Sequence, residues 1–294
     1  MTFDFVGRRK YWYILSLLII IPGIISLFVQ GLNEGIDFTG GNLMEVRFEK
    51  DVSVEQVRNI LKDFNLENSP VQSSGQREVI IRTRELSEQE SEKVIAGLRE
   101  KAGDLTVLRN EHVAAVISRE LTGRALAALG IASVLMLIYI SWRFEFKQGV
   151  AAVAALLHDG LITLGAFSLL QLEVDSSFVA AVLTVLGYSI NDTIIIFDRI
   201  RENSKGALKG KPVEELVNVS IRQTLARSIN TVLAVVFMLL ALLFFGGTTI
   251  KVFVTALLIG VIGGAYSSIF TASPLWVDLK KRFDGAKQAG RVRA

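Results

Sequence analysis

The sequence contains no cysteine and only two histidines among its 294 residues. Without thiols, the chain can form no disulfide framework, cysteine-ligated zinc site, iron–sulfur cluster or thiol nucleophile. The two histidines form no pair of potential ligands, which argues against a transition-metal site. An H-E-x-x-H stretch and a P-loop pattern are both missing, which excludes a zinc protease and disfavours ATP hydrolysis. We therefore predict no cofactor, no metal and no enzymatic activity.

Long apolar runs, separated by polar stretches, dominate the rest of the sequence. Hydrophobic residues make up 51% of the chain, and the mean hydropathy is +0.44. Six runs approach the ~20 residues that a helix needs to cross a hydrocarbon layer of about 30 Å. This pattern predicts an α-helical polytopic membrane protein with one large water-exposed insert. The predicted spans are Tyr11–Val29, Ala125–Trp142, Gly149–Leu172, Ser176–Phe197, Ser228–Phe245 and Val252–Trp276.

The distribution of charge predicts how these spans are oriented. Lys and Arg cluster before the first span, after the second and fourth spans, and in the tail. Because short cytoplasmic loops collect basic residues, we expect both termini in the cytoplasm and residues 30–124 outside it. That insert carries a net charge of −4 and the remainder +7, so the basic pI of 9.1 reflects membrane topology. It does not indicate nucleic-acid binding.

The first apolar run is predicted to be an uncleaved anchor. It is long for the h-region of a signal peptide, Pro22 and Gly23 lie inside it, and no A-x-A-like cleavage site follows. We therefore expect four parts: a cytoplasmic N-terminus with the first helix (1–29), an extracytoplasmic domain (30–124), five further helices (125–276) and a basic cytoplasmic tail (277–294).

The polar insert shows a regular order of predicted elements. Strand character is found at residues 42–49, 71–73, 78–84 and 105–108, and helical faces at 53–64 and 87–101. Ser53 is positioned to cap the first of these helices, and Ser74-Gly75 is a predicted turn. The resulting β-α-β-β-α-β order predicts a ferredoxin-like α+β domain.

Polar and ionisable residues inside the apolar spans are candidates for function, because they are costly in a membrane. Asp192 lies among apolar neighbours in the fourth span, on a stripe with Thr184 and Tyr188. A second polar stripe at the start of the fifth span contains Thr224, Arg227, Ser228 and Thr231. If these two spans are antiparallel neighbours, Asp192 and Arg227 lie at similar depth and can pair.

Structural explanations compete with a functional one for several of these residues. Arg227, taken alone, is equally well explained as an anchor whose side chain reaches the membrane interface. Asp198, near the end of a helix, is better explained as an interfacial charge. In the third span, His158, Asp159 and Thr163 are expected to face the bundle, although Asp159 can instead lie at the helix entrance, because its depth depends on where the span begins. Accessory polar roles are expected for Asp159, Tyr188, Asn191 and Thr184.

A glycine-rich heptapeptide, Gly35-Ile-Asp-Phe-Thr-Gly-Gly41, lies just beyond the first span. Its glycines permit a tight backbone path before the first strand. Combined with the Gly-Tyr-Ser-Ile-Asn-Asp-Thr stretch at 187–193 and the six-span plan, it resembles the SecD/SecF family of protein-export membrane subunits. The resemblance covers essentially the whole chain. The motif residues that carry it after the first span are Gly35, Asp37, Phe38, Gly40 and Gly41.

The resemblance implies a function that the residues alone do not indicate. It implies one half of an RND-type transporter in the bacterial cytoplasmic (inner) membrane, with SecD supplying the other half. The two subunits would use the proton-motive force to pull an unfolded polypeptide out of the Sec translocon, SecYEG, with YajC as a further candidate partner. It also implies that Asp192 and Arg227 lie on the proton path, together with an acidic residue of SecD.

Two other function classes share some of these features. An RND-like exporter of lipid or small molecules has the same six-span plan, but such proteins usually carry both halves and larger exported domains in one chain. An intramembrane aspartyl protease would use Asp159 and Asp192 as its carboxylate pair. Its Gly-x-Gly-Asp pattern is missing here, because Asp192 follows Ser189-Ile-Asn191.

Overall fold

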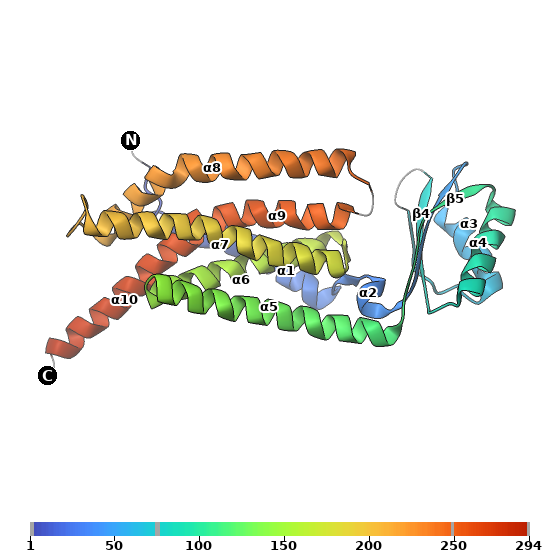
Figure 1. Cartoon of the computed structure of the whole chain (residues 1–294), viewed down its shortest axis with the longest axis horizontal. Helices are drawn as coiled ribbons and strands as arrows, with labels where there is room; N and C mark the ends of the chain where they lie inside the picture. The colour runs from blue at the N-terminus through green and yellow to red at the C-terminus, as the bar shows by residue number, and fades with distance from the viewer. Residues whose placement is uncertain (1–2, 74–76, 248–249, 293–294) are drawn as a thin grey trace. The chain divides into compact units, whose positions relative to one another are not determined.

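The computed structural model describes residues 3–73, 77–247 and 250–292, and it divides into two compact units. The helical unit combines the first 33 residues with those from Ala127 onward, and the α+β unit is Glu34–Leu126. Figure 1 shows the order of the elements along the chain. The long helices are α1 (Arg9–Val29), α5 (Ala115–Arg143), α6 (Phe146–Leu170), α7 (Ser176–Lys205), α8 (Val213–Phe245), α9 (Lys251–Ser267) and α10 (Ser273–Val292).

Six helical stretches of the described residues are long and apolar enough to cross a membrane. The sixth runs from Lys251 to Phe283, because α9 continues through a π-helical turn, η3 (Ser268–Ala272), into α10. The six predicted membrane helices are therefore confirmed, and the chain is a multi-pass membrane protein.

The predicted helix ends differ from the observed ones between the fourth and fifth spans. This stretch is expected to be a basic loop, but α7 continues to Lys205 and α8 already begins at Val213. Hydropathy detects the apolar part of a helix that matches the membrane thickness, and it does not detect polar turns that continue the same helix beyond it. The connection is therefore a short segment between two helices that both extend past their apolar runs.

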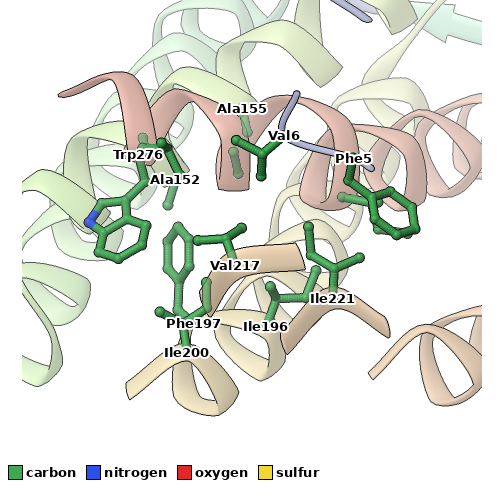
Figure 2. Close-up of a cluster of buried hydrophobic side chains, with 14 of the residues drawn as sticks. Phe5, Val6, Ala152, Ala155, Ile196, Phe197, Ile200, Val217, Ile221 and Trp276 are labelled. Carbon is green, nitrogen blue, oxygen red and sulfur yellow. The ribbon is translucent and has the colours of Figure 1, made fainter. Parts of the chain in front are cut away.

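The helices of the helical unit pack around α9, which contacts α6, α7 and α8. The largest buried cluster brings side chains from the N-terminal segment, α6, α7, α8 and α10 together (Figure 2). Asn218 of α8 fixes the N-terminal segment, because its Oδ1 accepts the backbone N–H groups of Phe5 and Val6 at 2.8 and 3.1 Å. The labelled cluster residues are Phe5, Val6, Ala152, Ala155, Ile196, Phe197, Ile200, Val217, Ile221 and Trp276.

The α+β unit contains a four-stranded antiparallel sheet with two helices. Its strands are β2 (Gly41–Phe48), β3 (Val71–Ser73), β4 (Glu78–Thr83) and β5 (Leu105–Val113), and its main helices are α3 (Val54–Leu61) and α4 (Glu88–Ala102). The strand order β3-β4-β2-β5, with every neighbouring pair antiparallel, is that of a ferredoxin-like fold. The predicted domain type is thus confirmed. The predicted turn at Ser74-Gly75 lies outside the described residues.

Local sequence explains how the elements of this unit begin and pack. Ser53 caps α3 in a capping box with Gln56, as the sequence predicts, and Ser87 caps α4 in the same way. Strand β5 is longer than predicted and continues to Val113. The apolar face of the sheet packs on α3 and α4 in one buried core that includes Val46, Phe48, Val57, Leu61, Ile81 and Leu98.

The heptapeptide after α1 forms a single helical turn, α2 (Ile36–Thr39), that leads into β2. It ends in two glycines at positive φ, 74° for Gly40 and 115° for Gly41. A Cβ at Gly41 would lie 2.2 Å from the carbonyl oxygen of Thr83, so only glycine fits between the turn and β4. The tight path expected from the glycines is present.

Candidate functional site

Asp192 is buried in the middle of α7, with 7% of its surface exposed. Its Oδ1 atom accepts a hydrogen bond of 2.6 Å from the Ser228 hydroxyl of α8. Its Oδ2 atom is buried and has no hydrogen-bond partner among the described residues. Removing a polar oxygen from water without a partner is unfavourable. This carboxyl group is therefore held on one side and unsatisfied on the other.

The expected direct pair of Asp192 with Arg227 is not formed in the described part of the chain. Neighbouring positions on a helix point about 100° apart, so Arg227 and Ser228 cannot both point at Asp192. Ser228 is buried against Asp192, whereas Arg227 is exposed. Asp192 and Arg227 lie at similar depth, as predicted. The hydrogen-bond partner of Asp192 is the Ser228 hydroxyl and not the Arg227 guanidinium.

Arg227 instead lines a cavity of about 290 Å³ between α5, α7 and α8. Asp198 shares this cavity and bonds Arg201 at 2.7 Å, with Arg143 at 3.6 Å. These contacts fit the predicted interfacial charge at Asp198. The cavity therefore brings side chains of both signs of charge together, with Arg227 directly next to Ser228, the partner of Asp192.

The accessory polar residues predicted on α7 differ in their surroundings. The Tyr188 hydroxyl is buried and, among the described residues, has no hydrogen-bond partner. Thr184 is exposed, and its hydroxyl donates to the Ala180 carbonyl of its own helix. Asn191 is also exposed. The stripe therefore turns from a buried end at Asp192 to an exposed side of α7.

Asp159 of α6 is the most deeply enclosed carboxyl group in the described structure, with 0% of its surface exposed. Its Oδ2 atom accepts hydrogen bonds from Ser189 of α7 at 2.6 Å and Ser267 of α9 at 2.8 Å. Its Oδ1 atom lies 3.0 Å from Nδ1 of His158. Asp159 thus connects α6, α7 and α9. It lies in the middle of α6, not at the helix entrance that the sequence also allowed, and it makes more contacts than an accessory role requires.

Asp159 and Asp192 do not form a carboxylate pair. The first bonds hydroxyls on α7 and α9, and the second a hydroxyl on α8. A dyad of the aspartyl-protease kind needs two carboxyl groups that share a proton. The described contacts show no such sharing, and this removes the geometric basis of the protease alternative.

The serine partners of Asp159 are not marked in the sequence. Serine carries no charge and is common in membrane helices, so nothing in its spacing marks it as a partner of an acid on another helix. His158 and Asp159 are both buried, in agreement with the expectation that they face the bundle, but the spacing does not predict which groups on other helices they contact. The contacts that the sequence does not mark are those of Asp159 with Ser189 and Ser267, and those that lead from His158 to Ser16 and Tyr266.

Comparison with known proteins identifies the family. Residues 93–282 match the family described as protein export membrane protein SecD/SecF, C-terminal, and residues 25–52 match the SecD/SecF GG motif. The chain belongs to the SecD/SecF family. The second match contains the Gly35–Gly41 heptapeptide, and the first contains both Asp159 and Asp192.

Members of the SecD/SecF family resemble the chain over nearly its full length. Protein translocase subunit SecF of Sebaldella termitidis is 42% identical, with 96% of this chain and 93% of that protein covered. Protein translocase subunit SecDF of Bacillus subtilis is 41% identical over 95% of this chain but only 38% of its own length. The crystal structure of SecDF from Thermus thermophilus, described as a translocon-associated membrane protein, has a TM-score of 0.88 and 37% identity. This chain covers 39% of that solved chain, and 96% of this chain is matched.

Proposed function

We propose that this chain is a SecF-type subunit that works with SecD and couples the proton-motive force to late export of polypeptides through the Sec translocon. Family membership and the near-complete match to proteins named translocase subunit SecF support this assignment. The SecD half of the larger SecDF relatives corresponds to the part of those proteins that this chain does not cover.

The observation that carries the proposal is the half-satisfied carboxyl group of Asp192. An ionised carboxylate with one oxygen unpaired in a membrane is expensive, and a proton removes that charge. Protonation and release at Asp192 therefore change how strongly α7 is held to α8 through Ser228. Each charge that moves through a potential of 100 mV supplies about 2.3 kcal/mol, enough to shift a two-state equilibrium substantially.

An exposed polar face beside Asp192 supports the need for a partner half. Asn191 on α7 and Arg227 on α8 are both exposed in the isolated chain. A charged side chain exposed to lipid is unfavourable even near the end of a membrane span. Coverage by a second protein with a complementary acid removes this cost, and we assign that role to SecD. Arg227 then acts across the interface, next to the Ser228 contact of Asp192.

The topology and surroundings of the subunit belong to the same proposal. Both termini face the cytoplasm, residues 30–124 lie on the opposite side of the bacterial inner membrane, and the parts are 1–29, 30–124, 125–276 and 277–294. SecYEG and YajC are the proposed neighbours, and the emerging unfolded polypeptide is the proposed cargo. Substituted-cysteine labelling of residues in each part tests this topology, since the sequence has no other cysteine.

Asp192→Asn tests the proposed coupling. In vesicles that contain the variant, SecD and the translocon, we expect ATP-driven entry of a secretory protein to continue. Completion of export after ATP is exhausted, driven by a proton gradient, should be lost. Asp198→Asn is the matched control, because this acid lies on the same helix but is partly exposed and paired with Arg201. It should export like the parent protein.

Two outcomes contradict the proposal. Normal gradient-driven export by Asp192→Asn shows that this carboxyl group carries no coupling role. Purification of the chain from native membranes without a SecD-like protein contradicts the proposed partnership. Replacing the proton gradient with a sodium gradient of equal size identifies the coupling ion.

A further inference from the structure

A continuous hydrogen-bond chain crosses the helical unit apart from Asp192. It begins at the backbone carbonyl of Trp12 in α1, which accepts a bond of 2.8 Å from the Tyr266 hydroxyl of α9. Tyr266 lies 3.3 Å from the Ser16 hydroxyl, and Ser16 lies 2.9 Å from Nε2 of His158. Nδ1 of His158 then lies 3.0 Å from Oδ1 of Asp159. The hydrogen bonds thus lead from α1 to α9, return to α1 at Ser16, and end on α6.

The direction of every bond in this chain follows from its first member. A carbonyl oxygen can only accept, so Tyr266 gives its single hydrogen to Trp12. Tyr266 must then accept from Ser16, which uses the single hydroxyl hydrogen of Ser16. Ser16 can therefore only accept from His158, so Nε2 of His158 carries a hydrogen.

The other ring nitrogen of His158 also carries a hydrogen. Oδ2 of Asp159 accepts the hydroxyls of Ser189 and Ser267, and its Oδ1 atom faces Nδ1 of His158 at 3.0 Å. An ionised carboxylate accepts and cannot donate. Both nitrogens of His158 are thus donors, which is the condition of an imidazolium ion.

We propose that His158 and Asp159 form a second proton-binding site in the membrane, with the proton held as a buried imidazolium–carboxylate pair. The pair is electrically neutral as a whole, which suits a site where neither residue is more than 8% exposed. This site is distinct from Asp192, whose hydrogen-bond partner is Ser228 of α8.

Other charged groups around the site are already engaged or are separated from it. On α1, Tyr13 and Arg9 are both bonded to Asp278 of α10. Helix α7 carries Asp192, which bonds Ser228, and α9 presents Tyr266. The π-helical turn η3 has no ionisable side chain. Among the described contacts, His158 is therefore the only cation bonded to Asp159.

Loss of the proton has a defined structural consequence. A neutral His158 that keeps its Nδ1 hydrogen on Asp159 presents Nε2 as an acceptor. Ser16 must then turn its hydrogen toward Nε2 and away from Tyr266, so the bond between Ser16 of α1 and Tyr266 of α9 is lost. Occupancy of the site is thereby linked to the contact between these two helices.

Nitrogen NMR of the full chain in lipid, assembled with its native partners and labelled only at histidine, tests the proposal. His112 is the only other histidine, so a His112→Gln background leaves one imidazole signal. At about pH 7 we expect the two ring nitrogens of His158 to resonate as an imidazolium. Tyr266→Phe removes the acceptor of the Ser16 hydrogen without removing a charge. It should lower the ratio of imidazolium to neutral imidazole about tenfold, the effect of one hydrogen bond worth about 1.4 kcal/mol.

Thr163→Val is the matched control, because within the described structure the Thr163 hydroxyl bonds only the backbone carbonyl of Asp159. Its ratio should equal that of the parent protein. A neutral His158 in the parent protein overturns the proposal, and so does a Tyr266→Phe ratio equal to that of the control. Since the protonation state is read directly, this test is independent of export, and normal or failed export by Asp192→Asn does not affect it.

Discussion

Replacement of Gly165 by alanine tests how closely α1 and α6 approach each other. A Cβ at Gly165 would lie 2.8 Å from the Cα atom of Gly23, which is backbone and cannot rotate away. Carbon atoms in contact prefer about 3.5–4.0 Å, so α1 must move by about 1 Å. Overpacking of this kind costs about 1–3 kcal/mol. We expect Gly165→Ala to lower the free energy of unfolding by that amount.

Gly160→Ala on the same helix provides the comparison. A Cβ there meets nothing within 4 Å, and removal of a glycine from a helix stabilises it by about 0.5–1 kcal/mol. The two variants should therefore shift the melting temperature of the detergent-solubilised protein in opposite directions.

A disulfide between Ser26→Cys and Ser168→Cys provides a second measurement of the same contact. The two serine hydroxyls lie 2.7 Å apart on α1 and α6, and the sequence contains no other cysteine to compete. The cross-link should form readily in the parent background and more slowly with Gly165→Ala. If Gly165→Ala raises the melting temperature as Gly160→Ala does, or leaves cross-linking unchanged, then the two helices do not pack at this glycine pair.

Two further predictions concern carboxyl groups outside the membrane spans. Hydrogen bonds from the Gly7 backbone and the Asn218 side chain hold the pKa of Asp4 below its ordinary value. The stability that these bonds provide is therefore fully present at a pH above the ordinary pKa of Asp, and it is lost as the pH falls through the lowered pKa of Asp4. Amide exchange in the N-terminal segment should accelerate over that acid range, and at neutral pH in Asn218→Ala; equal protection in the variant contradicts the assignment. The backbone N–H and then the hydroxyl of Ser87 lower the pKa of Glu90, so the first turn of α4 should lose exchange protection on acidification, and Glu90→Gln should remove this pH dependence. A variant that keeps the full acid response excludes Glu90 as its source.

The two units differ in how far the sequence predicts them. The strand and helix order of the α+β unit is encoded in alternation and in caps such as Ser53, which act over a few residues. The six membrane spans are equally predictable, because length and apolarity alone define them. The helix ends near Lys205 and Val213 are not, since polar turns beyond the membrane resemble loop sequence.

The candidate sites were predictable as positions but not as contacts. A carboxyl group among apolar neighbours marks Asp192 without any structure. The choice between Arg227 and Ser228 as its partner depends on the rotation of α8 about its axis, which packing sets and hydropathy does not. The bonds of Asp159 are hidden in the sequence for the same reason, because they come from uncharged serines on two other helices.

Helices α7 and α8 continue beyond their apolar runs, so their polar ends amplify a change in helix tilt within the membrane. At 1.5 Å per residue, the 33 residues of α8 span about 50 Å, roughly 20 Å more than the hydrocarbon layer. A tilt of about 10° inside the membrane therefore displaces the far end of the arm by about 3 Å. A small change in helix tilt at the Asp192–Ser228 contact would therefore produce a larger displacement at the end of α8 outside the membrane, where another protein could bind.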